Sequence, residues 1–154
     1  MATHYWKNKD ESTENIYQKL INKFFSELKI IKILLTFRDN EKLDDEGQII
    51  LATTRKCSSK EIDLWGYHAE ICMDYELWKK ANKVDKYRLA FHELNHIELK
   101  REKDSSEIKM DDNNNPMIDI VKHDIIMKTF VKEIETFGLE GNECDVAKFL
   151  SSIL

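Results

Sequence analysis

The run YRLAFHELNHIELKRE, residues 87–102, is the feature that most constrains the fold. Its apolar residues recur at spacings of three and four, which predicts an amphipathic helix over about residues 85–101. A second stripe on this helix combines apolar residues with two histidines, so both sides of the helix should be packed and the histidines need polar partners or a bound ion. The broad apolar face consists of Tyr87, Ala90, Phe91, Leu94 and Ile97, and the second stripe of Leu89, His92, His96 and Leu99.

The H-E-x-x-H spacing within this run predicts a metal site. Four residues along a helix rotate the side chain by about 400°, so His92 and His96 project from one face and can reach one ion. Glu93 lies about 100° further round, where a carboxylate can take a proton from a water activated by the ion without binding the ion itself. Only 5 of the 154 residues are histidine, which makes a chance match unlikely. The alternative is a hydrogen-bonded pair of core histidines.

A catalytic zinc site needs a third protein ligand and leaves its fourth position for water. One three-histidine pattern requires a glycine and a further histidine shortly after the motif, but those positions hold leucine and glutamate here. In another pattern a glutamate on a later helix is the ligand, and Glu133 and Glu135 are the nominal candidates. Both lie off the apolar stripe of the helix predicted for residues 118–137, whereas His123 lies on it. We predict His123 as the third ligand; the alternative is a partly buried core histidine.

The remaining elements follow from apolar periodicity and turn residues. Helical spacing predicts a first helix over residues 13–29, capped by Ser12 or Thr13. The segments RDNEKLDDEG, CSSKEIDLWG and DSSEIKMDDNNN are expected to be loops. Strands are predicted over residues 30–37, 48–55 and 67–75, and helices from about residue 75, over 118–137 and within 146–154.

This pattern predicts an α+β fold in one domain, residues 1–154. A small twisted mixed sheet of three to four strands should pack on the central helix that carries the motif, with further helices at the N- and C-terminal ends. The strand over residues 67–75 is either an exposed edge, to which a peptide could add as a further strand, or an interior strand. Tyr67, His68 and Tyr87 are candidate oxyanion donors, and the sequence does not distinguish among them.

Composition bears on partners and location. The net charge of −5 disfavours nonspecific binding to nucleic acid or to an anionic membrane. The three cysteines are far apart in sequence, and an odd number without a C-x-x-C pair fits reduced thiols better than a disulfide framework. No apolar run reaches the length of a signal-peptide core or a membrane span. We therefore expect a cytoplasmic protein with no membrane or nucleic-acid partner.

The order of Trp78, then YRLAFHELNHIEL, a polar loop and KHDIIMKTFVKEIETFG resembles the family of putative phage metallopeptidases over approximately residues 48–138. The resemblance implies a zincin-like fold with Zn²⁺ as cofactor, held by His92, His96 and His123. It also implies that Glu93 is the catalytic acid/base, that the substrate is a peptide or protein, and that the protein is of phage or prophage origin and acts in the bacterial host cytosol. Two alternatives are a zinc-stabilised zincin-fold protein that binds a host target without catalysis, and a zinc hydrolase acting on a nonpeptide substrate.

Overall fold

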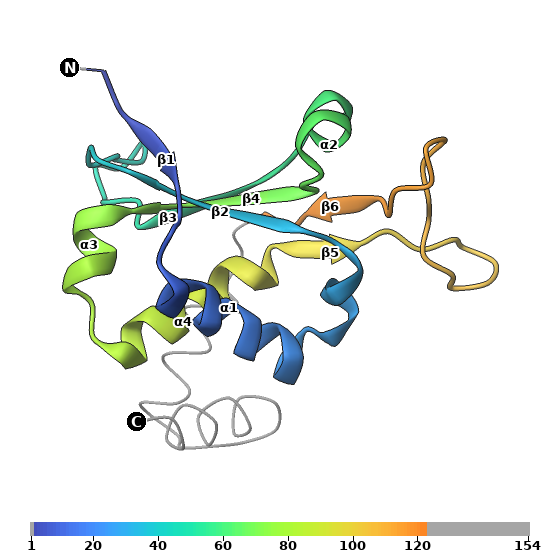
Figure 1. Ribbon diagram of the computed structural model, residues 1–154, viewed down its shortest axis with the longest axis horizontal. Helices are drawn as coiled ribbons and strands as arrows, with labels where there is room; N and C mark the ends of the chain where they lie inside the picture. Colours follow the sequence, from blue (N-terminus) through green and yellow to red (C-terminus); the bar gives the residue numbers. More distant parts are fainter. Residues whose placement is uncertain (1, 123–154) are drawn as a thin grey trace.

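A mixed four-stranded sheet with helices packed on one face forms the body of the protein (Figure 1). The computed structural model describes residues 2–122, so most of the helix predicted over 118–137 and all of the helix predicted within 146–154 lie outside the described residues. The predicted α+β class with a small mixed sheet is confirmed. The elements are β1 (Tyr5–Lys7), α1 (Glu11–Phe24), the 3₁₀ helix η1 (Ser26–Ile30), β2 (Ile33–Arg38), β3 (Ala52–Lys56), α2 (Ser59–Trp65), β4 (Ala69–Asp74), α3 (Tyr75–Lys80), α4 (Lys83–Asn95), β5 (Ile97–Leu99) and β6 (Ile118–Ile120).

The strand order of the main sheet is β1-β2-β4-β3. The two central strands, β2 and β4, run parallel, and each outer strand is antiparallel to its neighbour. This order decides between the two interpretations of residues 67–75: β4 is an interior strand, and β1 and β3 form the two edges. Strands β5 and β6 make a separate antiparallel pair, with Ile97 opposite Ile120.

The core lies between the sheet and the two long helices, α1 and α4 (Figure 1). Residues three and four apart on α1, including Ile16 and Leu20, are buried. Tyr17 of α1 stacks on Trp78 of α3 at a centroid distance of 6.2 Å. The Trp78 indole N–H donates a hydrogen bond of 3.1 Å to the buried Thr13 hydroxyl, so these two polar groups satisfy each other inside the core.

The first helix and strand differ from the prediction at their ends. Helix α1 starts at Glu11 because the Asp10 carboxylate accepts the Ser12 backbone N–H as the N-cap, in place of Ser12 or Thr13. The α-helix ends at Phe24, and residues 26–30 form the 3₁₀ helix, so the following strand begins at Ile33 rather than at residue 30. β1 was not predicted, because three exposed residues carry no periodic signal.

The segment over residues 57–66, expected to be a loop, contains α2. Ser58 and Glu61 form a capping box, in which each side chain accepts a hydrogen bond from the backbone N–H of the other. Gly66 ends the helix in the left-handed conformation, at φ 76°. Both signals are present in the sequence S-x-x-E followed by glycine, so this helix could have been predicted.

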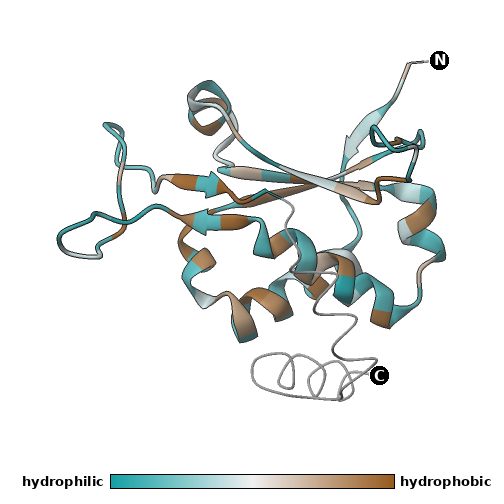
Figure 2. Ribbon diagram, turned by 180° about the vertical axis from the view of Figure 1, so that it is seen from behind, coloured by the Kyte–Doolittle hydropathy of each residue, from teal (hydrophilic) through white to brown (hydrophobic). Residues whose placement is uncertain are grey.

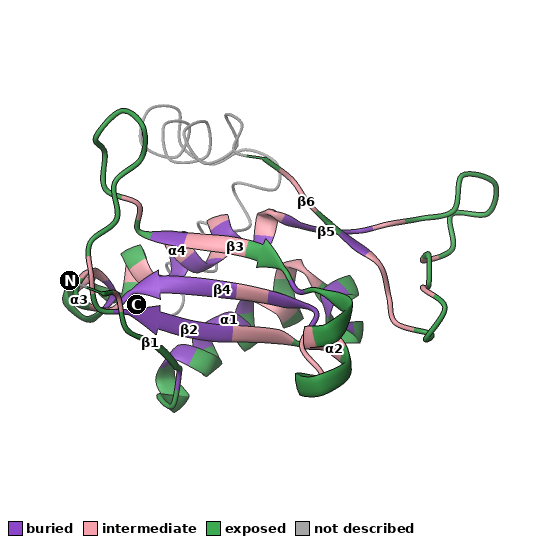
Figure 3. Cartoon of the chain, turned by 90° about the horizontal axis from the view of Figure 1, so that it is seen from above, coloured by how far each residue is buried: buried purple, intermediate pink, exposed green. Residues whose placement is uncertain are grey.

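The end of α4 also differs from the prediction. The helix ends at Asn95 instead of residue 101, and Ile97 and Leu99 point to the buried side of β5. The predicted helix over residues 118–137 is wrong at its start, because residues 118–120 form β6 and pair with β5. Figures 2 and 3 show that the chain between β5 and β6 is mostly hydrophilic and exposed, whereas the central strands are buried. No helix among the described residues is long and apolar enough to cross a membrane.

Core burial gives a first prediction. Leu20 is 0% exposed between α1 and the sheet, whereas Leu64 on α2 is 64% exposed. Leu20→Ala should lower the free energy of unfolding by about 2–5 kcal/mol, because it leaves a cavity. Leu64→Ala should change it by less than about 0.5 kcal/mol. Urea denaturation of both variants measures the difference, and equal effects would contradict this packing.

A charge cluster on the outer side of the sheet gives a second prediction. Arg55 of β3 contacts Glu61 of α2 at 2.7 Å and Glu70 of β4 at 2.5 Å. The Arg55 guanidinium lowers the pKa of Glu61 to about 2, from an ordinary 4.5. A depressed carboxyl pKa contributes stability that is present above about pH 4.5 and is lost as the pH falls toward 2.

The melting temperature of Glu61→Gln should therefore lie below that of the wild type at pH 6, and the difference should shrink as the pH falls through this window. Asp63→Asn, which alters an exposed carboxylate on the same helix, is the control. A wild-type advantage over Glu61→Gln that stays constant down to pH 2 would show that Arg55 does not depress this pKa.

Candidate metal centre

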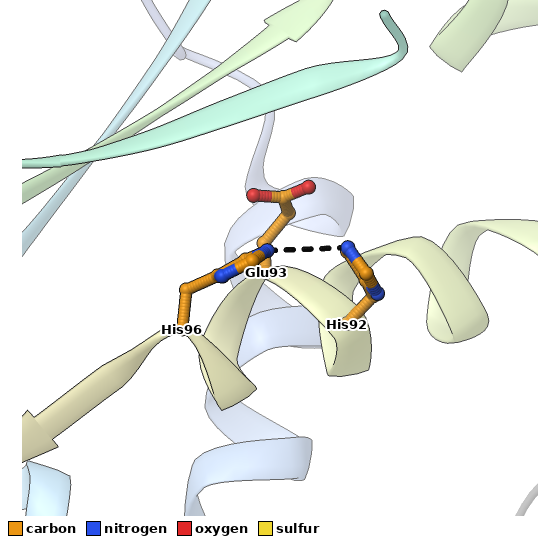
Figure 4. Close-up of side chains that lie close together, drawn as sticks. All are labelled: His92, Glu93 and His96. Carbon is orange, nitrogen blue, oxygen red and sulfur yellow. Dashed lines mark hydrogen bonds between the residues drawn. The ribbon is translucent and has the colours of Figure 1, made fainter. Parts of the chain in front are cut away.

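The three residues of the motif lie where α4 ends. His92 and Glu93 are in its last turn, and His96 is the C-cap residue. His96 keeps helical backbone angles, φ −71° and ψ −18°, so the helical rotation continues through it although the chain then turns into β5. The predicted projection of both imidazoles from one face is therefore confirmed: their Nε2 atoms lie 3.2 Å apart (Figure 4).

Val121 orients the His96 ring. The His96 Nδ1 atom lies 2.6 Å from the Val121 carbonyl oxygen, which can only accept, so Nδ1 carries the proton. The Nε2 lone pair is then directed toward His92. The Val121 backbone N–H donates in turn to the His96 carbonyl at 2.7 Å. Val121 directly follows β6, so the pairing of β5 with β6 brings this residue to the ring.

The distance between the two rings fits a shared transition-metal ion. Two ligand nitrogens of a tetrahedral zinc, each about 2.0–2.1 Å from the ion, lie about 3.3 Å apart. The observed 3.2 Å is close to this value. One ligand atom from each of His92, Glu93 and His96 lies within 4.8 Å of the others. Two imidazoles beside a carboxylate form a donor set that suits zinc or a neighbouring transition metal.

Glu93 is buried against the edge strand. Its side chain is 2% exposed, and the Thr54 hydroxyl lies 2.5 Å from its Oε2 atom. A buried carboxylate requires such donors, because removal from water without a hydrogen bond is strongly unfavourable. Burial, with a contribution from the Glu93 charge, raises the pKa of Tyr17 well above its ordinary value. Sequence reasoning missed Thr54, since no spacing rule links it to a residue 39 positions away.

On the side away from β4, none of the described strands pairs with the main chain of β3. Leu51 accepts a hydrogen bond from Asp74, and Cys57 donates one to His68. Because bonded pairs alternate in an antiparallel ladder, the N–H and C=O groups of Ala52, Thr54 and Lys56 point outward. Within the described part of the chain, no backbone hydrogen bond occupies these groups. Strand β6 lies near β3 without pairing with it.

The other candidate residues are only partly placed. His123, Glu133 and Glu135 lie outside the described residues. Tyr87 is buried in the core. The Tyr67 ring lies under the Lys7 ammonium at 5.2 Å, and a hydrogen bond with Tyr67 raises the pKa of Lys7. His68 accepts the Lys32 backbone N–H on Nδ1 at 3.0 Å. A role for any of the three in binding an oxyanion stays a prediction.

Comparison with known proteins identifies the family. The sequence model of the family described as Putative phage metallopeptidase matches residues 4–153. The chain belongs to this family. The resemblance noted from the sequence is thus confirmed, and membership implies a metal ion and a peptide or protein substrate. The curated proteins and the solved structures contain no match to this chain.

The hydrogen bonds of two histidines predict opposite tautomers. His96 should carry a proton on Nδ1, because Nδ1 donates to the Val121 carbonyl. His68 should carry its proton on Nε2, because its Nδ1 accepts from Lys32. Two-bond ¹⁵N–¹H correlation spectra distinguish these forms. An Nε2–H tautomer for His96 would contradict the orientation described for the site.

Proposed function

We propose that this protein is a zinc-dependent metallopeptidase with a single zincin-like domain. His92, His96 and His123 hold the zinc, and Glu93 is the general base and acid. The observation that carries the proposal is the pair of Nε2 atoms 3.2 Å apart beside the buried Glu93 carboxylate. Family membership supports a metal and a peptide substrate, and the donor set supports zinc. His123 completes the three protein ligands that a catalytic zinc requires.

Each residue of the site has its own role in the proposed hydrolysis. Bound zinc would supply Lewis acidity, which lowers the pKa of water to about 7 and stabilises negative charge on oxygen. Glu93 accepts the proton of the water that attacks the carbonyl carbon and then delivers that proton to the leaving amine. The Val121 carbonyl holds His96 in the tautomer that presents its Nε2 lone pair.

The substrate binds as an extended peptide along the edge of β3. This assignment replaces β4, which is interior. Outward-facing N–H and C=O groups on β3 can pair with a peptide backbone, and Thr54 on the same strand contacts the carboxylate of Glu93. Main-chain pairing gives affinity that depends little on sequence, so side-chain preferences would come from neighbouring surfaces.

The family description and the free thiols support the proposed setting. The family is described as a phage family, so we place the protein with a phage or prophage and its action in the host cytosol. Cys57 and Cys72 are free cysteines, as expected in a reducing compartment. Buried Cys57 has a raised pKa, which keeps the thiol protonated and unreactive.

Glu93→Gln separates chemistry from metal binding. The substitution removes the base but keeps the size of the side chain and a hydrogen-bonding oxygen. Hydrolysis should therefore fall by roughly 10²- to 10⁴-fold while zinc content and melting temperature change little. His92→Ala and His123→Ala should lose zinc and stability together, because metal affinity is linked to folding. Elemental analysis, thermal melts and proteomic comparison of cleavage in host lysate measure these quantities.

His4→Ala, at an exposed histidine, is the control and should keep both zinc and activity. If Glu93→Gln keeps the biological effect while the ligand variants lose it, the protein is a zinc-stabilised binding protein without catalysis. If neither the wild type nor any variant carries a transition metal after expression in zinc-replete medium, His92 and His96 are a core histidine pair and the proposed function is wrong.

A further inference from the structure

We propose that Thr54 is a positioning residue that orients the Glu93 carboxylate and aligns the bound peptide with it. The inference rests on the proposed function, because it assigns a role to a neighbour of the proposed base. Thr54 belongs to β3, a strand 39 residues away from the motif in sequence. The Thr54 side chain contacts Glu93, and the Thr54 main chain lies at the unpaired edge of the sheet.

The side-chain contact fixes the carboxylate. The Thr54 hydroxyl lies 2.5 Å from Glu93 Oε2 and 3.5 Å from the Glu93 backbone oxygen. A hydroxyl has one proton to donate, and the shorter contact to a charged acceptor is the stronger bond. Holding Oε2 in this way sets the rotation of the carboxylate about its last side-chain bond. This contact therefore determines how the carboxylate is presented to the proposed metal-bound water.

The residue type suits this role. Threonine is β-branched, so its side-chain rotamers are restricted in a strand and the hydroxyl has a fixed direction. Successive side chains of a strand point to opposite faces, so Thr54 faces the helices and the adjacent Thr53 faces the other side of the sheet. The register supports this placement, because Thr54 lies opposite Ile71, which is buried in the core, and Thr53 lies opposite Cys72.

The main chain of Thr54 connects the base to the substrate. Its N–H and C=O point away from β4, toward the edge on which the peptide is proposed to bind. A peptide strand added there pairs with the backbone of the residue whose hydroxyl holds Glu93. The peptide bond in register with Thr54 is therefore the one nearest the carboxylate, and main-chain pairing selects the bond that is cut.

Thr54→Val tests the role, because valine keeps the branched shape and removes the donor. We expect kcat to fall roughly 10- to 100-fold, the range for loss of a hydrogen bond to a charged group, with KM within about twofold. Thr54→Ser should restore most of kcat, because it returns the hydroxyl. Thr53→Val, at the adjacent residue on the opposite face, should behave like the wild type. Zinc content should be the same in all three variants.

The double variant Thr54→Val/Glu93→Gln separates positioning from a general structural effect. If Thr54 acts through Glu93, its substitution should cause no further loss of residual activity in the Glu93→Gln background. Melting temperatures of the wild type, both single variants and the double variant should also be non-additive, and this measurement does not require activity.

Wild-type kcat in Thr54→Val, or an equal loss in both backgrounds, would overturn the inference. Loss of zinc in Thr54→Ser as well as Thr54→Val would also overturn it, because the residue would then be structural. Failure of the proposed function would give different results from failure of this inference. Glu93→Gln would keep full activity, or no variant would bind zinc. Non-additive melting temperatures would still report the contact between Thr54 and Glu93.

Discussion

The packing of α4 between α1 and the sheet is the constraint on which the rest of the structure depends. Tyr87, Ala90 and Leu94 are buried along the helix, and Phe91 packs on Phe24 and Phe25 at the end of α1. A helix covered on two sides has little freedom to rotate or slide, because either movement would expose apolar surface. The directions of the motif side chains are therefore fixed by the core, before any metal is considered.

The sequence predicted the part of the site that is local. The rotation of a helix relates His92, Glu93 and His96, so their arrangement follows from spacing alone, and the structure places the ligand atoms together as expected. Buried β4 was found as a strand for the same kind of reason. The place of β4 in the sheet could not be predicted, because strand order depends on contacts between distant segments. No local pattern encodes which strand lies at the edge.

The errors at element ends have physical causes. Residues 97–99 fit both a helical stripe and a strand alternation, and a three-residue apolar pattern cannot separate the two. These residues form a strand because they pair with β6, through Ile118 and Ile120. Strand β6 lies about twenty residues further along the chain. Thr54 was missed for a similar reason, since its contact with Glu93 depends on how β3 lies over α4. Among these differences, only α2 could have been recognised in the sequence, from Ser58, Glu61 and Gly66.

The burial of Glu93 bears on the choice between the two interpretations of the histidine pair, a metal site or a core pair. A core pair of imidazoles could satisfy itself by a hydrogen bond and would have no need of a neighbouring carboxylate. Burying a carboxyl group without a hydrogen-bond partner is strongly unfavourable, and here the Thr54 hydroxyl, from another element, is a partner. If only stability mattered, an apolar residue would be more favourable than a glutamate at this position. Local conflicts with stability of this kind concentrate at functional sites, because there the chemistry requires the unfavourable group. Glu93 is buried beside two imidazoles and is held by an edge strand. This position favours a role in catalysis over a role in packing.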